Sequence, residues 1–125
     1  MKTITINKND IPEWEYGDVV VKKFSFGGKL RLSEHTNTTS IKDNKVAVGE
    51  KIVNNYELGI STLCEGIHSI KDAENYEYLI RPHSHVDDKK TFFTNDDISV
   101  ESGLYLLQQV KEYNNPTSED EKKNL

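Results

Sequence analysis

The segment RPHSHVDD, residues 81–88, carries the side chains of this sequence that are best suited to chemistry. Imidazole and carboxylate groups are common protein ligands of zinc, iron and manganese. If the segment is extended, His83, His85 and Asp87 point to the same side, because side chains alternate along a strand with a period of two residues. These three residues are therefore candidate metal ligands of a small metal-dependent enzyme.

The rest of the sequence gives this metal hypothesis little support. No histidine follows residue 85, and His35 and His68 lie in segments that we expect to form unrelated elements. The segment 81–88 would have to supply every ligand alone. We therefore interpret it as a weak candidate metal site, favour a solvated polar loop, and predict no cofactor.

No other motif predicts catalysis. The FGGK segment lacks the spacing and the following Ser or Thr of a phosphate-binding loop, and the chain has no Gly-x-Ser-x-Gly or Cys-x-x-Cys motif. Asp96 and Asp97 are typical of negative charge in the first turn of a helix. Cys64 has no basic neighbour in the sequence that would activate its thiol, so we predict that it is a small buried hydrophobe. We predict that the protein is not an enzyme.

The length of 125 residues fits one domain, which we place at residues 1–115, followed by a charged flexible tail at residues 116–125. The formal net charge of −5 argues against nucleic acid as the main partner. Aromatic side chains alternate with lysines near the N-terminus, as on some single-strand binding surfaces. With this acidic balance we favour core packing for the aromatic residues, which are Trp14, Tyr16, Phe24 and Phe26.

The location of the protein can also be predicted from the sequence. The single cysteine cannot form an internal disulfide, which fits a reducing compartment. No run of apolar residues is long enough to span a membrane. Residues 1–6 lack the apolar region of a signal peptide. We therefore expect an intracellular protein with no membrane partner.

The first third of the chain predicts β-structure. The alternating residues 3–6 and the β-rich residues 19–26 are typical of strands. Gly27-Gly28 is typical of a tight hairpin turn, because both central residues of such a turn need positive φ. The strand that follows this turn would place Leu30 and Leu32 on an apolar face. Lys29 and Arg31, with Lys23 of the preceding strand, would lie on a solvated face. Residues 34–45 are polar and predict a loop.

Two later segments have the period of amphipathic helices. The first runs over residues 53–70, where Gly59 and Gly66 leave room for a close neighbour. The second runs over residues 94–113, with Thr94 or Asn95 as its N-cap. The apolar stripe of the first consists of Val53, Tyr56, Ile60, Leu63, Ile67 and Ile70, and that of the second of Val100, Leu104, Leu107 and Val110.

These elements predict an α+β protein. It would have an N-terminal β-hairpin or short strands, followed by a small bundle of two or three helices and a disordered acidic C-terminal tail. The YEYLI segment at residues 76–80 would form a short strand or a helical turn.

Three segments of this sequence and a charged tail follow one another in an order that resembles that of a known protein family. VVVKKFSFGGKLRLSE is followed by YELGISTLCEGIHSI, by FFTNDDISVESGLYLLQQVKEYN and by the charged SEDEKKN. Over residues 18–124 this order is similar to the small tail assembly chaperones of long-tailed phages and archaeal proviruses. The resemblance implies a protein of the host cytoplasm that binds and solubilises the tape measure protein during tail morphogenesis and helps to recruit the tail tube protein.

The resemblance also implies a mode of binding. An extended helical client with an exposed apolar stripe suits a groove between helices. Two other functions stay open: a structural virion subunit, such as a tail or head–tail connector component in a homo-oligomer, and the metal-dependent enzyme described above. The candidate partner-binding residues are Tyr56, Ile60, Leu63, Ile67, Leu104 and Leu107.

Overall fold

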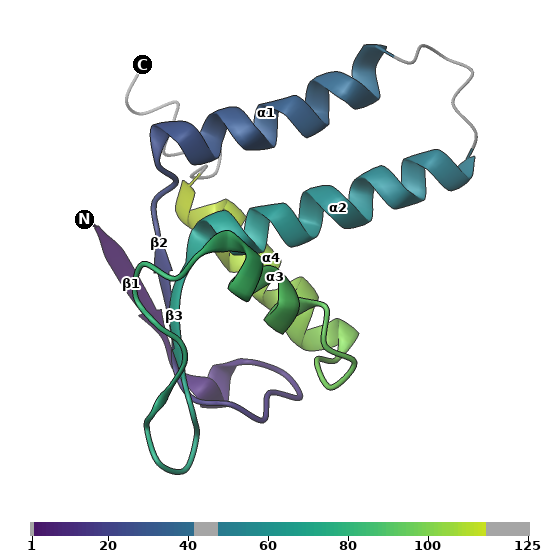
Figure 1. Ribbon diagram of the computed structural model, residues 1–125. Helices are drawn as coiled ribbons and strands as arrows, with labels where there is room; N and C mark the ends of the chain where they lie inside the picture. The colour runs from purple at the N-terminus through teal and green to yellow at the C-terminus, as the bar shows by residue number, and fades with distance from the viewer. Residues whose placement is uncertain (1, 42–47, 115–125) are drawn as a thin grey trace, which may run out of the picture.

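The computed structural model describes the backbone of residues 2–41 and 48–114. Within these ranges it describes the side chains of residues 2–33 and 56–114. The predicted α+β class is confirmed, with one pair of strands before the first two helices and one pair after them (Figure 1). The tail predicted at residues 116–125 lies outside the described residues. The elements are β1 (Thr3–Ile6), the 3-10 helix η1 (Lys8–Asp10), β2 (Val19–Lys22), α1 (Phe26–Ile41), α2 (Val48–Gly66), β3 (Ile67–Lys71), β4 (Tyr78–Ile80), α3 (Val86–Phe93) and α4 (Val100–Asn114).

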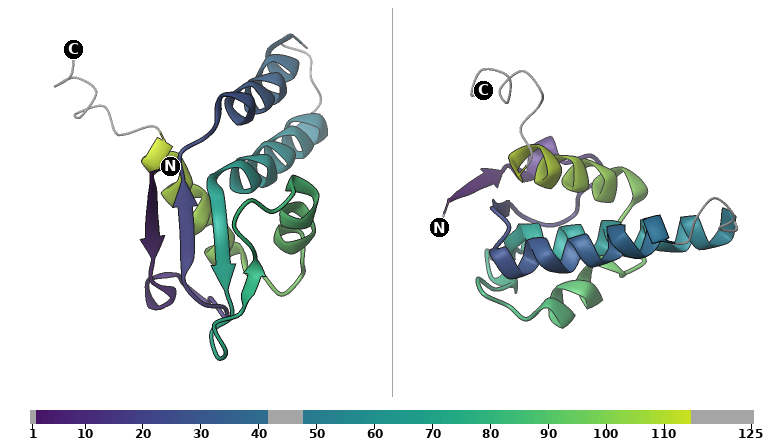
Figure 2. Two further views of the ribbon diagram at one scale, coloured as in Figure 1. Left: turned by 60° about the vertical axis from the view of Figure 1, so that its left-hand side comes forward. Right: turned by 90° about the horizontal axis from the view of Figure 1, so that it is seen from above.

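The four strands form one antiparallel sheet in the order β1-β2-β3-β4. Ile6 pairs with Val19, Val19 with Ile70, and Ile70 with Ile80. Directly paired residues share a face of the sheet, so these four apolar side chains lie together. Figure 2 shows the helices on one side of the sheet, and the buried residues of the strands belong to the same core as those of the helices.

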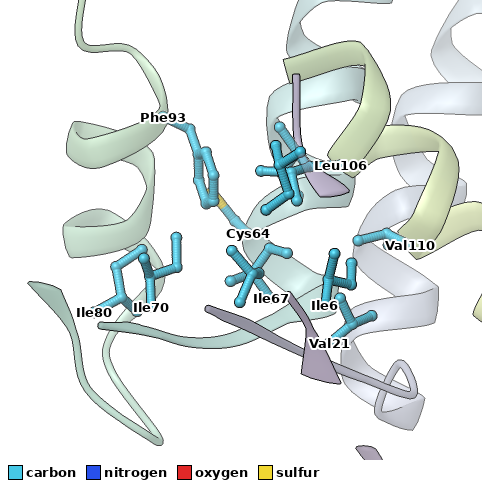
Figure 3. Packing of buried hydrophobic residues seen from close by; sticks show 12 residues of the cluster. Ile6, Val21, Cys64, Ile67, Ile70, Ile80, Phe93, Leu106 and Val110 are labelled. Carbon is cyan, nitrogen blue, oxygen red and sulfur yellow. The ribbon is translucent and has the colours of Figure 1, made fainter. Parts of the chain in front are cut away.

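The hydrophobic core lies between the inner face of the sheet and helices α2, α3 and α4. Val21 and Ile67 come from the sheet, Leu106 and Val110 from α4, and Phe93 from the end of α3; Figure 3 shows them meeting in one cluster. Both valines of β2 that face inward are fully buried, as the period of two predicts for a strand with one covered face. The core therefore fixes where α2 and α4 sit relative to the sheet.

The predicted hairpin turn at Gly27-Gly28 is wrong, because these residues lie in the first turn of α1. Neither glycine has positive φ, so the tight turn does not form. The Ser25 hydroxyl accepts a hydrogen bond from the Gly28 N–H at 3.0 Å, which is how serine caps a helix N-terminus. Helix α1 also replaces the beginning of the loop that we predicted from residue 34 onward.

The basic strand face predicted for that hairpin does not form, although Lys23, Lys29 and Arg31 are exposed, as predicted for a solvated face. Lys23 donates to the Tyr113 carbonyl oxygen and lies over the Tyr113 ring, 4.1 Å from its centroid. Arg31 instead forms a two-pronged ion pair with Glu65 of α2, at 2.6 and 2.9 Å. Lys23 thus contacts α4, whereas Arg31 contacts α2.

The first predicted helix ends earlier than its stripe suggested. Helix α2 stops at Gly66, and the last two residues of the stripe, Ile67 and Ile70, belong to β3, where they pair with Val21 and Val19. β-Branched residues suit a strand with a buried face, so tertiary pairing overrides the helical period here. The predicted role of Val53 lies outside the described side chains.

The second predicted helix, residues 94–113, begins later than predicted, because α4 starts only at Val100. A separate helix that we did not predict, α3, precedes it at Val86–Phe93. The Ser99 hydroxyl accepts a hydrogen bond from the Ser102 N–H at 3.0 Å and so caps α4 in place of Thr94 or Asn95. Asn95 instead holds the intervening turn by accepting from the Asp97 N–H at 2.9 Å. The YEYLI segment supplies the short strand β4, one of the two options that its sequence favoured.

Candidate partner-binding groove

An apolar groove of about 290 Å³ lies between α2 and α4, with the end of α3 contributing to its wall. Of its lining side chains, only Ser99 and Tyr56 carry a polar group, and none belongs to Asp, Glu, Lys, Arg or His. We call this surface the α2–α4 groove. Its lining residues are Tyr56, Gly59, Ile60 and Leu63 of α2, Phe93 of α3, Ile98 and Ser99 of the following turn, and Val100, Gly103, Leu104 and Leu107 of α4.

The groove is concave because small residues face its space. At the C-terminal end of α2, a methyl group on Gly66 would overlap Val110 of α4, so the two helices touch there. At Gly59 an added methyl group would lie 3.7 Å from Leu107, an ordinary contact distance. At Gly103 nothing lies within 4 Å. The space between α2 and α4 therefore widens toward the beginning of α4.

The rim of the groove exposes large apolar side chains. Tyr56, Val100 and Leu104 expose 58%, 71% and 62% of their surface. Leu63 and Phe93, in contrast, are buried and form the floor. An apolar floor with an exposed apolar rim is typical of a surface that binds another molecule.

The structure brings five of the six predicted partner-binding residues together. Tyr56, Ile60, Leu63, Leu104 and Leu107 all line the groove, although they come from helices far apart in the sequence. The sixth, Ile67, is fully buried in the core because it is the first residue of β3.

Helix α4 has two apolar faces, and the predicted stripe mixed them. Leu106 and Val110 are fully buried against the sheet, one turn apart. Val100 and Leu104 face the groove and are largely exposed. Leu106, which the predicted stripe omits, is a fully buried residue of the core.

Sequence reasoning missed four contributors to the groove: Phe93, Ile98, Ser99 and Gly103. Phe93 and Ile98 lie in and after α3, a helix that we did not predict. Gly103 falls one residue before Leu104 and has no apolar side chain to detect. Gly103 lies inside the second predicted helix, where glycine destabilises a helix by about 1 kcal/mol relative to alanine. That cost was a signal in the sequence that this position has a special role.

The candidate metal ligands are not arranged as a metal site. His85 is the N-cap of α3, and its Nδ1 accepts a hydrogen bond from the Asp87 N–H at 3.1 Å. The His83 ring instead packs edge-on against His68, with 5.2 Å between ring centroids. Among the side chains that the structure describes, those of residues 2–33 and 56–114, no group of three from His, Cys, Asp or Glu could hold a metal ion. The helix cap explains the local arrangement of His85 and Asp87.

Cys64 and Lys89 are two neighbouring titratable residues that lie in the core, outside the groove lining. Lys89 is almost fully buried, and its Nζ donates to the Cys64 carbonyl oxygen at 3.2 Å, near the end of α2. Burial raises the pKa of the Cys64 thiol to about 11 and lowers the pKa of the Lys89 amine to about 8. A buried, protonated thiol is a poor nucleophile, which agrees with the predicted role of Cys64 as a small hydrophobe.

The aromatic residues near the N-terminus pack as the sequence indicated, with one exception. Trp14 and Tyr16 meet edge to face with 5.0 Å between ring centroids, and Phe92 joins them from α3. Phe24 is also packed against the core. Phe26, in contrast, is 82% exposed at the start of α1.

Comparison of the chain with protein-family models, with curated proteins and with solved structures finds no match. Among the described helices, none has both the length and the apolar character needed to cross a membrane. Functional conclusions therefore depend on the geometry of the groove and on the resemblance noted in the sequence.

Proposed function

We propose that this protein is a non-enzymatic binding protein whose α2–α4 groove holds an amphipathic helical segment of another polypeptide. The observation that carries the proposal is the groove itself. It is apolar, open, rimmed by exposed Tyr56, Val100 and Leu104, and built from two helices that the core holds in place. This is the arrangement that helix-in-groove recognition needs.

The energetics favour an apolar partner segment over a polar small molecule. Fully burying one large apolar side chain contributes roughly 1.5–3 kcal/mol. Small-molecule sites combine an apolar wall with several converging polar groups that fix orientation. Here the lining offers only the Ser99 and Tyr56 hydroxyls, and Ser99 is already engaged as the cap of α4.

Within this class, the proposed role is that of a tail assembly chaperone of a long-tailed phage or archaeal provirus. The support is the sequence resemblance, together with a groove suited to a client with a repeated apolar helical stripe. The client would be the tape measure protein, kept soluble in the host cytoplasm until the tail tube protein assembles around it. Binding of the client requires neither a metal nor a catalytic group.

Co-expression with the tape measure protein from the same genome tests this proposal. We expect the full chain to keep the client in the soluble fraction and to co-purify with it. The double substitution Val100→Lys and Leu104→Lys should abolish both effects without unfolding the chain, because both side chains are largely exposed.

The control is Phe26→Lys, which replaces an even more exposed apolar side chain on α1, outside the groove lining. It should keep full chaperone activity, and circular dichroism should show that all variants fold. The proposal would be contradicted if the control alone lost co-purification, or if the groove variant still co-purified with the client.

A further inference from the structure

The charges that border the α2–α4 groove have one sign. Among described residues within two positions of a lining residue, every charged side chain is a carboxylate. Glu65 is neutralised by its ion pair with Arg31. The other four are exposed, and none forms an ion pair with another described residue; they are Glu57, Asp96, Asp97 and Glu101.

These carboxylates gather at the wide end of the groove. Asp96, Asp97 and Glu101 flank Ile98 and Val100, where α4 begins, and Glu57 follows Tyr56 on the opposite helix. The partial positive charge of the α4 N-terminus offsets only part of this concentration of negative charge.

Two described cations lie beside the last turn of α2, away from the wide end: Arg31 pairs with Glu65, and Lys89 donates to the Cys64 carbonyl oxygen. Lys90 precedes Phe93 by three residues, and Lys111 follows Leu107 by a full turn, toward the end where α2 and α4 touch at Gly66 and Val110. The border of the groove is therefore acidic at its wide end, and this polarity can select and orient a charged partner.

We infer that the partner segment is a basic amphipathic helix, with Lys or Arg beside its apolar stripe at the end that lies over residues 96–101. The inference rests on the proposed function, since it specifies the chemistry of the helix that the groove accepts. Apolar side chains of the partner fill the groove, while its cations face Glu57, Asp96 and Glu101. Such exposed charge pairs act mainly on the association rate and on the choice of partner.

Three synthetic helical peptides of about 18 residues, long enough for several helical turns, test this inference. They share one leucine stripe and carry Lys, Gln or Glu beside it. Their affinities for the full chain are measured by fluorescence anisotropy at low and high salt. We expect the Lys peptide to bind on the order of tenfold more tightly than the Glu peptide at low salt, and the difference to shrink at high salt.

Two charge-reversal variants separate the groove from the overall negative charge of the protein. Glu57→Lys with Glu101→Lys should remove or invert the preference for the Lys peptide. Glu74→Lys with Glu77→Lys changes the net charge equally in the exposed β3–β4 connection and should preserve that preference.

The outcomes distinguish the two proposals. Equal affinities of the three peptides, or the same preference in both variants, would overturn the basic partner and leave helix docking intact. If none of the peptides binds, helix docking in the groove fails as well, and with it the proposed function.

Discussion

Two leucines on α4, two residues apart, separate the roles of stability and binding. Leu106 is fully buried in the core, whereas Leu104 exposes 62% of its surface at the groove rim. A helix places residues two positions apart on opposite sides, so one helix can serve the core and a partner at the same time. The apolar residues of α4 were visible in the sequence, but their division between two faces depends on where the sheet lies.

Alanine substitutions should separate these roles. Leu106→Ala should lower the free energy of unfolding by about 2–5 kcal/mol, because it leaves a cavity in the core. Leu104→Ala should change it by less than about 1 kcal/mol, because the side chain is largely in water. Urea denaturation measures both values, and equal losses would show that Leu104 belongs to the core.

Lys89 should make stability depend on pH. Its pKa is lowered from 10.5 to about 8 by burial, so between these values the unfolded chain binds a proton that the folded chain does not. Stability from this residue therefore rises with pH across the window from 8 to 10.5, by roughly 3 kcal/mol at most. Below pH 8 both states are protonated and the penalty for the buried charge stays constant.

The substitution Lys89→Met, which is of similar length, isolates this effect. The stability of the variant relative to the natural chain should be highest below pH 8 and should fall toward pH 10.5. The raised pKa of the Cys64 thiol, about 11, acts in the opposite direction in the natural chain, and it rises further in the variant because the Lys89 charge that lowers it is removed. Parallel stability curves for the two proteins would show that Lys89 does not titrate in this window.

At the scale of elements, sequence periodicity found α2 and α4 but misplaced their ends. Gly27-Gly28 fits a hairpin turn by residue type, yet the Ser25 cap two residues earlier starts a helix there. Ile67 fits the helical stripe, yet pairing with Val21 makes it part of a strand. Each error has the same cause: a local pattern allowed two structures, and a contact distant in the sequence or a cap decided between them.

The contact between α2 and α4 should depend on Gly66. Gly66→Ala should destabilise the fold by about 1–3 kcal/mol, because the added methyl group overlaps Val110. The second substitution Val110→Ala should recover part of this loss. Gly103→Ala is the matched control: its methyl group meets nothing within 4 Å, so it should stabilise α4 by about 0.5–1 kcal/mol. Thermal unfolding that ranks the two single variants equally would contradict this contact.

At the scale of the whole molecule, one face of the sheet is covered by helices (Figure 1), and the α2–α4 groove has a buried floor and an exposed rim. The edge strands of the described sheet are β1 and β4, with four and three residues. Strands this short offer little backbone for pairing with a neighbour. The groove is therefore a better surface for contact with another chain than the sheet edges on which a ring of virion subunits would depend.

The α+β class and five of the groove residues could be predicted from the sequence, because stripes of Tyr56, Ile60 and Leu63 or of Leu104 and Leu107 are local patterns. The existence of a groove could not be predicted, because it depends on how the core separates α2 from α4 at Gly103. The same holds for the His83–His85 segment, whose role as a helix cap depends on α3 forming at all.

Site-specific photocrosslinking tests the central claim most directly. A photoreactive phenylalanine analogue is placed at position 104 or at position 26 of the full chain, which is then co-expressed with the tape measure protein. We expect a crosslink to the client from position 104, on the groove rim, and none from position 26, which is even more exposed, on α1. A crosslink from position 26 with none from position 104 would contradict the role of the groove.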